Sequence, residues 1–349
     1  MCLYPRLIRN KKYTANKKNG GVIPAVSDKR VLWVPVGCGK CMECVKQKGR
    51  EWQVRLLEEV RHNKTGKFVT MTFSDESILE LTKELNGLSG YNLDNTIATL
   101  ATRRFLERCR KKYKKSIRHF LITELGHQGT ENIHMHGILF TERPMEEIRD
   151  LWGYGYMWIG TEEKGKPIQN YVTERTVNYI TKYITKIDND HKEYKPKVLT
   201  SAGIGKGYTE RYDSETNNFK DVDTNEAYRT RTGHKMSLPI YYRNKIYTDE
   251  EREKLWLNRL DEQVRWVGGE KIDVSENDVA YWNAVEHYRQ KNKRLGYGDD
   301  SKNWEQKRYE NEQRRMKQKE RIDRAEKRKE EKPSFGWGGL GEDKGETWG

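Results

Sequence analysis

The sequence predicts an α+β fold in which helices pack on one face of an antiparallel β-sheet. Residues 67–73 alternate apolar and polar side chains and are rich in β-forming residues, which is typical of a strand. Residues 119–124 and 133–140 are strand-like segments on either side of a polar turn, which predicts a hairpin. With the helical segments between them, the order β-α-β-β-α-β-α is typical of such a sheet with helices packed on it. A cysteine-rich segment precedes this core, and a basic arm, either helical or disordered, follows it.

The helices carry periodicity and start signals of their own. Residues 51–62 place Val54 and Leu57 on one face, and Asp94 is predicted to cap a helix that reaches about Tyr113. The remaining elements follow in chain order: a helix over 144–152 with a proline near its start, a short strand over 156–160, and helices over 173–186, 248–260 and 277–291.

The charge balance favours a partner that is a polyanion. The 349-residue chain has 67 lysine and arginine residues against 53 aspartate and glutamate residues, a formal net charge of +14. Such a field favours nucleic acid over an anionic membrane surface. The 20 tyrosines and 10 tryptophans supply rings that can stack on unpaired bases. No apolar run approaches the ~18 residues of a membrane span, and the start lacks the apolar core of a signal peptide, so we expect a soluble protein without a membrane partner.

Composition divides the chain into four segments. Residues 289–332 contain 17 basic and 10 acidic residues, so half of the net charge lies in this stretch, which is nearly without apolar residues. We expect a solvated helix or a disordered arm there. The predicted segments are a cysteine-rich N-terminal segment over 1–50, a main domain over 51–245, a basic helical region over 246–332 and a flexible tail over 333–349.

The strongest chemical signal is the pair His134 and His136 on a predicted strand. Side chains two residues apart on a strand point to the same face, so the two imidazoles can bind one metal ion together. If the hairpin forms, Glu124 lies beside them, and this donor set leaves coordination positions open for a substrate oxygen. The alternative is two hydrogen-bonded surface histidines and a glutamate solvated at a strand end.

A second signal is a repeated Tyr-x-x-Lys unit in the predicted helix over 173–186. Tyr179 and Tyr183 lie four residues apart on one helix face, and Lys182 and Lys186 each follow a tyrosine by three residues. A phenol with a pKa near 10 is a poor nucleophile unless its target is activated. A divalent ion and Lys182 could activate a phosphate and stabilise the developing charge. The alternative is an amphipathic helix that turns its isoleucines inward and its tyrosines and lysines toward solvent.

Two other groups are candidates for binding. The helix that ends near Tyr113 is densely basic at its C-terminal end, and it is either a phosphate-binding surface or a solvated face; its candidate DNA contacts, together with Lys186, are Arg103, Arg104, Arg108 and Lys111. The cysteines at the start of the chain form either a structural zinc site, free thiols or an iron–sulfur cluster; their ligands would be Cys2, Cys38, Cys41 and Cys44. Cys109 is expected to be buried or partly buried.

Three motifs in order resemble those of HUH endonucleases that initiate rolling-circle replication: the strand over 68–73, the His-hydrophobe-His strand and the Tyr-x-x-x-Tyr helix. The doubled tyrosine motif resembles that of the replication initiators of microviruses. The opening residues 1–3, the cysteine segment 36–44 and residues 238–242 resemble the gokushovirus branch of these phages. The resemblance covers about residues 1–245 and implies an HUH endonuclease domain over 51–245.

The resemblance implies a concrete activity. Enzymes of this family nick one strand of origin DNA in the presence of Mg²⁺ or Mn²⁺ and keep the 5′ end as a phosphotyrosine ester. The free 3′-hydroxyl primes the host polymerase, and the second tyrosine later helps to close the displaced strand into a circle. It implies roles for a metal-binding pair, two alternating nucleophiles and an accompanying lysine, which are His134, His136, Tyr179, Tyr183 and Lys182. Glu124 as third ligand follows from its placement, and Tyr171 is the fallback nucleophile.

The implied partners are phage origin DNA, single-stranded and replicative, with a host helicase and polymerase in the host bacterial cytoplasm, where disulfides are not expected. A relaxase or transposase-type HUH enzyme, or a non-catalytic single-stranded nucleic-acid-binding protein, are the alternative hypotheses. Wide separation of Tyr179 and Tyr183 from the two histidines would exclude the enzymes.

Overall fold

The centre of the molecule is a five-stranded antiparallel sheet. The computed structural model describes residues 1–127, 131–160, 170–299 and, further on, 314–315, 318, 321–322, 324–328 and 330; the predicted tail over 333–349 lies outside these residues. The strands, in sheet order, are β6 (Met157–Trp158), β3 (Gly66–Met71), β5 (Ile133–Phe140), β4 (Arg118–Leu125) and β7 (Val198–Thr200). The predicted hairpin is β4–β5, and its two long strands lie in the middle of the sheet.

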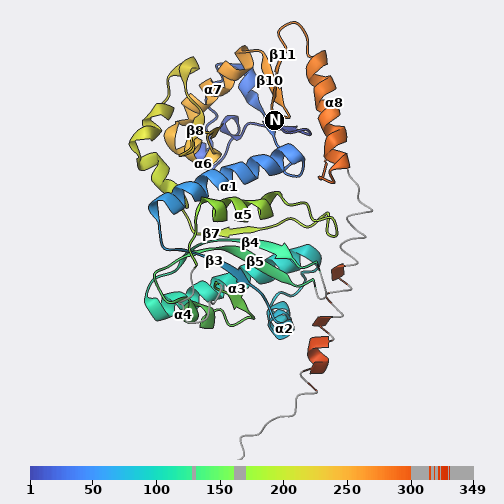
Figure 1. Cartoon of the computed structure of the whole chain (residues 1–349). Helices are drawn as coiled ribbons and strands as arrows, with labels where there is room; N and C mark the ends of the chain where they lie inside the picture. The colour runs from blue at the N-terminus through green and yellow to red at the C-terminus, as the bar shows by residue number, and fades with distance from the viewer. Residues whose placement is uncertain are drawn as a thin grey trace, which may run out of the picture.

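Helices cover both faces of this sheet, whereas the sequence predicted helices on one face only (Figure 1). One face packs against α2 (Asp75–Glu84), α3 (Gly90–Tyr113) and α4 (Met145–Asp150). The other face packs against α5 (Glu174–Thr185), which is covered in turn by α1 (Met42–His62). Alternation explains both layers, because successive residues of β4 and β5 are apolar on both faces and so supply two separate apolar clusters.

The rest of the described chain lies on the far side of α1 (Figure 1). Its first part joins the two ends of the sequence, because the N-terminal cysteine segment packs against a hairpin and α8 in one apolar cluster. Its second part is a tyrosine-rich cluster over α1. The elements are β1 (Arg6–Arg9), β2 (Trp33–Val36), β8 (Ala227–Arg229), β9 (Lys235–Ser237), α6 (Ile240–Ile246), α7 (Asp249–Asp261), β10 (Val264–Val267), β11 (Glu270–Asp273) and α8 (Val279–Arg294). Short 3₁₀ helices at Lys11–Tyr13, Lys17–Asn19, Lys29–Leu32, Lys206–Glu210, Tyr212–Asn217 and Asp221–Asp223 connect them.

Several predicted boundaries differ from the structure. The helix predicted over 51–62 begins at Met42, so the predicted boundary at residue 50 falls inside α1. Asp94 does not cap α3, because that helix begins at Gly90 and buries Asp94 within its first turns. α2 and the short strands outside the sheet were not predicted. Among the described helices, none is long and apolar enough to cross a membrane.

Candidate metal and tyrosine site

Strand register brings the predicted donors together on the face of the sheet that α5 covers. In the β4–β5 pair, Glu124 lies directly opposite His134, and in the β3–β5 pair Thr70 lies opposite His136. Residues directly opposite one another on antiparallel strands have their Cβ atoms about 5 Å apart. The hairpin alone therefore places the carboxylate beside the imidazoles.

Glu124 uses its two oxygens for different partners. Its Oε2 lies 3.2 Å from His134 Nε2 and 3.0 Å from His136 Nε2. Its Oε1 accepts a hydrogen bond of 2.5 Å from Lys186 Nζ. Burial alone would raise the pKa of Glu124, but the bonds with both histidines and Lys186 outweigh it and hold that pKa well below its usual range. The site therefore keeps an ionised carboxylate.

The donor set fits a divalent ion. One atom each of Glu124, His134 and His136 lies within 4.8 Å of the others, and all three residues are partly buried. Two imidazole nitrogens and one carboxylate oxygen are a set that binds first-row metal ions with coordination positions left open. Because the lysine takes the other carboxylate oxygen, the oxygen that faces the histidines is left for an ion.

Further hydrogen bonds orient the two rings. Thr70 Oγ1 lies 3.0 Å from His136 Nδ1, and the carbonyl oxygen of Asn132 lies 3.3 Å from His134 Nδ1. An Nδ1–H that donates to an oxygen fixes the tautomer and leaves Nε2 with a lone pair for a metal ion. Both Nε2 atoms accordingly face Glu124. Thr70 and Asn132 were not predicted, although Thr70 lies on the first predicted strand.

The two tyrosines of the predicted motif lie against the histidines. The ring of Tyr183 stacks on that of His136 with centroids 4.3 Å apart. The hydroxyl oxygens of Tyr179 and Tyr183 are 2.6 Å apart, and Tyr179 packs edge-on against Phe68. Burial, followed by the bond with Tyr179, raises the pKa of Tyr183, whereas Tyr179 is 48% exposed. This proximity retains the enzyme hypotheses.

The position of α5 depends on its apolar face. Ile180 and Ile184 are buried in the cluster between the sheet and α1, so the isoleucines do point inward as the amphipathic-helix hypothesis required. The opposite edge of the same helix carries the tyrosines to the histidines. The Thr173 side chain caps the helix N-terminus in a capping box with Thr176. The amphipathic and the functional interpretations are therefore both compatible with one helix.

The two lysines of the motif lie in different places. Lys182, the predicted catalytic lysine, lines a groove between α5 and α1, beside Lys46 and Arg50. Lys186, predicted as a DNA contact, bonds to Glu124 and lies 3.3 Å from His127 Nε2. Helical phase could have indicated this, since at 100° per residue Lys186 lies about 20° from Tyr179 around the helix and Lys182 about 60°. Tyr171, the fallback nucleophile, is exposed with Lys67 over its ring.

The basic end of α3 lies behind the sheet, because α3 packs on the face opposite the histidines. Arg104 pairs with Glu84, and Arg108 donates to the carbonyl oxygens of Leu151 and Trp152 after α4. These two side chains have structural partners within the chain. Arg103 is exposed, with Glu107 at 4.0 Å, and Lys111 is exposed, so DNA binding by α3 remains a prediction that concerns mainly these two.

The four N-terminal cysteines converge as predicted. Their sulfur atoms, in Cys2, Cys38, Cys41 and Cys44, lie within 4.8 Å of one another. The sulfurs of Cys2 and Cys41 are 3.9 Å apart, close to the ~3.8 Å edge of a tetrahedron with Zn–S bonds of about 2.3 Å. Hydrogen bonds from Cys41 and Cys44 lower the pKa of Cys38, which favours a thiolate. All five cysteines are free, and Cys109 is buried as expected.

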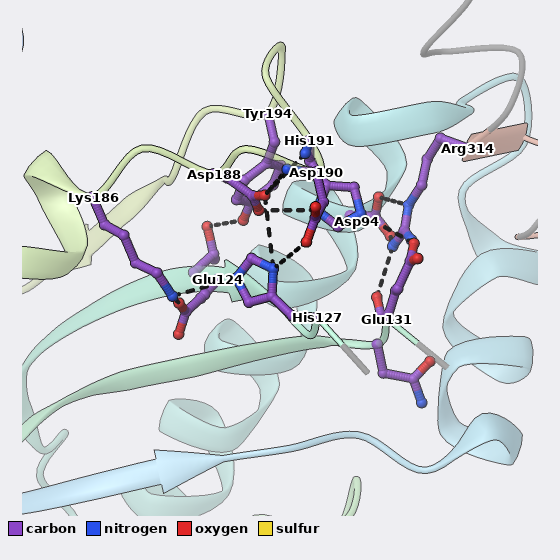
Figure 2. Close-up of polar contacts among 12 residues, drawn as sticks. Asp94, Glu124, His127, Glu131, Lys186, Asp188, Asp190, His191, Tyr194 and Arg314 are labelled. Atoms are coloured by element: carbon purple, nitrogen blue, oxygen red, sulfur yellow. Dashed lines mark hydrogen bonds and ion pairs between the residues drawn. The ribbon is translucent and has the colours of Figure 1, made fainter. Parts of the chain in front are cut away.

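A second polar cluster, which the sequence analysis missed, borders the site (Figure 2). His191 Nδ1 lies 2.9 Å from Asp188, and His191 Nε2 lies 3.0 Å from Glu131. His127 Nδ1 lies 3.0 Å from Asp190. Burial alone would lower the pKa of His191, but the two carboxylates outweigh it and raise that pKa. With both nitrogens bonded to carboxylates, His191 is an ion-paired imidazolium that ties two segments together.

Comparisons with known proteins agree with this site. Residues 66–188 match the model of a family described as replication-associated protein ORF2, a range that runs from β3 to just past α5. A curated relative, replication-associated protein VP4 of Bdellovibrio phage phiMH2K, is 26% identical over 203 residues, which cover 51% of this chain and 59% of the relative. No solved structure matches the chain. The family match and the relative together support the identification of this chain as a phage replication initiator.

Proposed function

We propose that this chain nicks and rejoins phage origin DNA through a phosphotyrosine intermediate at the site of Glu124, His134, His136, Tyr179 and Tyr183. The observation that carries the proposal is the stacking of Tyr183 on His136, with ring centroids 4.3 Å apart. A nucleophile and a set of metal ligands that derive from separate elements meet there. A surface histidine pair and a solvated helix would have no reason to meet.

His134, His136 and Glu124 would hold a Mg²⁺ or Mn²⁺ ion. A bound divalent ion supplies Lewis-acid chemistry, which makes the phosphorus of a bound phosphodiester more electrophilic. The protein contributes the orientation of the ligands: the hairpin fixes the carboxylate, and Thr70 and Asn132 fix the two rings. A rigid ligand set of this kind needs little rearrangement when the substrate binds.

The covalent step exchanges one phosphate ester for another. A phenolic oxygen of Tyr179 or Tyr183 forms a bond to phosphorus, and the bond from phosphorus to the 3′ oxygen breaks. The phenol loses its proton, the departing 3′ oxygen gains one, and no water or cofactor is consumed. Because the two hydroxyls are hydrogen-bonded at 2.6 Å, the proton of one can stabilise the other as a phenolate. The pair thus allows a second transfer to follow without release of the DNA.

Lys186 is the lysine that we assign to the reacting phosphate. Its ammonium lies at Glu124 Oε1, whereas Lys182 lines the groove toward α1. A positive charge at that point stabilises the negative charge that develops on the phosphate oxygens. Lys182, Arg103 and Lys111 are then candidates for contacts with the DNA backbone.

The test is incubation of the protein with labelled single-stranded oligonucleotides that tile the phage origin, with and without Mn²⁺, followed by a denaturing gel. We expect a metal-dependent protein–DNA adduct. The double variant Tyr179→Phe/Tyr183→Phe should lose it and still bind DNA, since only the two nucleophilic oxygens are removed. Tyr212→Phe is the matched control, because Tyr212 is 85% exposed and lies outside the site.

Other outcomes select the alternatives. Binding without any adduct on all oligonucleotides would favour a non-catalytic single-stranded nucleic-acid-binding protein. An adduct that survives the double variant and disappears in Tyr171→Phe would move the nucleophile to the fallback residue. An adduct on transfer-origin or transposon-end DNA, but not on phage origin DNA, would favour a relaxase or transposase-type enzyme.

We also propose that Cys2, Cys38, Cys41 and Cys44 hold a structural Zn²⁺. Their spacing suits a tetrahedral ion, and main-chain amides donate to the sulfurs of Cys2 and Cys38, as is common around thiolates. We expect one zinc per chain by elemental analysis, and its loss in Cys38→Ser. Cys109→Ser should retain the metal because that thiol is buried in α3. Full-length protein without zinc would refute this part of the proposal.

The same function implies partners and a place of action. The 3′-hydroxyl that the nick leaves needs a polymerase, and strand separation ahead of it needs a helicase, which we propose the host cell supplies in its cytoplasm. The chain spans about 59% of the length of the VP4 relative, so the partners of that protein come to this chain only as proposals.

A further inference from the structure

The C-terminal arm, by which we mean the described residues between 314 and 330, packs against the core of the molecule. These residues are helical. The side chains that are buried or bonded to the core recur every three or four residues, as one face of a helix requires. They are Arg314, Gln318, Arg321, Ala325 and Arg328, and all but the last are buried. The sequence predicted a solvated or disordered arm here, and this face is instead an interface.

Arg314 anchors the arm to the first turns of α3. Its Nε and Nη2 each donate to an oxygen of Asp94 at 2.9 Å, and both side chains are 1% exposed. Gln318 accepts a hydrogen bond from the amide of Gly90 at 3.0 Å and donates one to its carbonyl at 3.1 Å. A buried ion pair with two parallel hydrogen bonds fixes the mutual orientation of its partners.

The same guanidinium holds the turn that leads into β5. Arg314 Nη2 donates to the carbonyl oxygen of Glu131 at 3.1 Å, and Nη1 lies 3.4 Å from its carboxylate. Glu131 has φ = +50°, a conformation that residues other than glycine, asparagine and aspartate rarely adopt. Such a conformation persists only where surrounding contacts impose it, and Arg314 supplies two of those contacts.

The arm reaches the next residue by a second route. Arg328 lies 3.4 Å from a carboxylate oxygen of Asp75, and Asn132 donates to the other oxygen at 3.1 Å. Residues 131 and 132 are therefore held from the arm at both the backbone and the side chains. This turn is one edge of the candidate site.

From this turn, contacts run to both halves of the site (Figure 2). The carbonyl oxygen of Asn132 is the partner of His134 Nδ1. The carboxylate of Glu131 bonds to His191, which bonds through its other nitrogen to Asp188, in the segment directly after α5. One end of the path thus orients a predicted metal ligand, and the other fixes the chain that follows the tyrosine helix.

We propose that Arg314 is a positioning residue of the nuclease site: by clasping Asp94 and Glu131, it holds the turn before β5 in the conformation that orients His134. The inference rests on the proposed function, because it assigns the clasped turn to a metal-dependent reaction. The arm is then a working part of the enzyme, and its basic residues on this face serve the protein rather than the DNA.

The experiment measures Mn²⁺ binding by calorimetry on the full chain without DNA. Arg314→Ala is compared with the wild type and with Arg315→Ala, the exposed neighbour that serves as matched control. Loss of an outer contact of a metal-bound histidine typically costs 10- to 100-fold in affinity, so we expect Mn²⁺ affinity to fall about 10-fold in Arg314→Ala and to stay unchanged in the control. Arg314→Lys, which keeps the charge but not the two parallel bonds, should recover part of the loss.

The outcomes are separable from those of the adduct assay. A folded Arg314→Ala protein with wild-type Mn²⁺ affinity would overturn the inference, even if its melting temperature had fallen. Where Arg314→Ala does not fold, Arg314→Lys decides by the same criterion. A wild type that binds Mn²⁺ but forms no adduct would refute the proposed function and not the positioning role. A wild type that binds no Mn²⁺ would overturn both.

Discussion

The contact between α1 and α5 depends on one glycine, and replacing it should move the tyrosine helix. A Cβ atom built on Gly49 of α1 would lie 2.5 Å from Thr185 Cγ2 of α5, closer than non-bonded carbons approach. Thr185 lies two residues after Tyr183, so any shift that relieves this contact is transmitted to the site. We therefore expect Gly49→Ala to disturb both stability and adduct formation.

The magnitude follows from two opposing terms. Alanine in place of glycine within a helix gains about 1 kcal/mol, while forcing an extra methyl group into a packed contact costs about 1–3 kcal/mol. The net loss is then about 0–2 kcal/mol. Removing the opposing methyl with Thr185→Ser, which keeps the hydroxyl bond to the carbonyl of Lys182, should leave only the gain of about 1 kcal/mol.

The assay is a double-mutant cycle on melting temperature. A change of 1 kcal/mol shifts the melting temperature of a domain of this size by about 2–4 °C. Gly49→Ala should lower it in the wild-type background and raise it in the Thr185→Ser background, with adduct formation restored in the double variant. Equal shifts in both backgrounds would show that the two residues are not coupled and would refute the packing argument.

Three further predictions test separate parts of the structure. Thr70→Val removes the oxygen bonded to His136 Nδ1, so Mn²⁺ affinity by calorimetry should fall about 10-fold; an unchanged affinity would contradict the role of that bond. Glu58→Gln removes a 1% exposed carboxylate that holds Arg211, and the free energy of unfolding should fall by about 3 kcal/mol, measured by denaturant titration against a similar change at an exposed glutamate of α1. The guanidinium keeps a second, exposed carboxylate, which limits the loss. Because two carboxylates raise the pKa of His191 above its unfolded value, its stabilisation is full below about pH 6.5 and is lost as the pH rises through the folded pKa; the melting temperatures of His191→Gln and the wild type should therefore differ more at pH 5.5 than at pH 9, and an equal difference would show that the charge plays no part.

Much of the candidate site could be predicted because its geometry is local. The strand period fixed that His134 and His136 share a face, and one tight hairpin fixed that Glu124 lies opposite them. The helical period likewise put Tyr179 and Tyr183 on one face of α5. Relations over a few residues are set by backbone geometry, which varies little from one protein to the next.

What the sequence could not supply were the partners of charged side chains that lie far apart along the chain. Asp94 has the same local signature whether it caps a helix or meets Arg314, which is 220 residues away. Arg104 and Arg108 look like phosphate contacts until α2 and α4 supply their acceptors. The position of α1, packed on α5, likewise left Lys182 in a groove and Lys186 at Glu124.

The sequence by itself thus determined which residues carry the chemistry: two histidines, a carboxylate, two tyrosines and four cysteines, each recognisable from its spacing. Tertiary structure alone decided which charges serve that chemistry and which hold the molecule together, including the burial of the C-terminal arm on α3. The physical reason is that periodicity acts over one strand or one helical turn, whereas the partner of a buried charge is chosen by the packing of the whole chain.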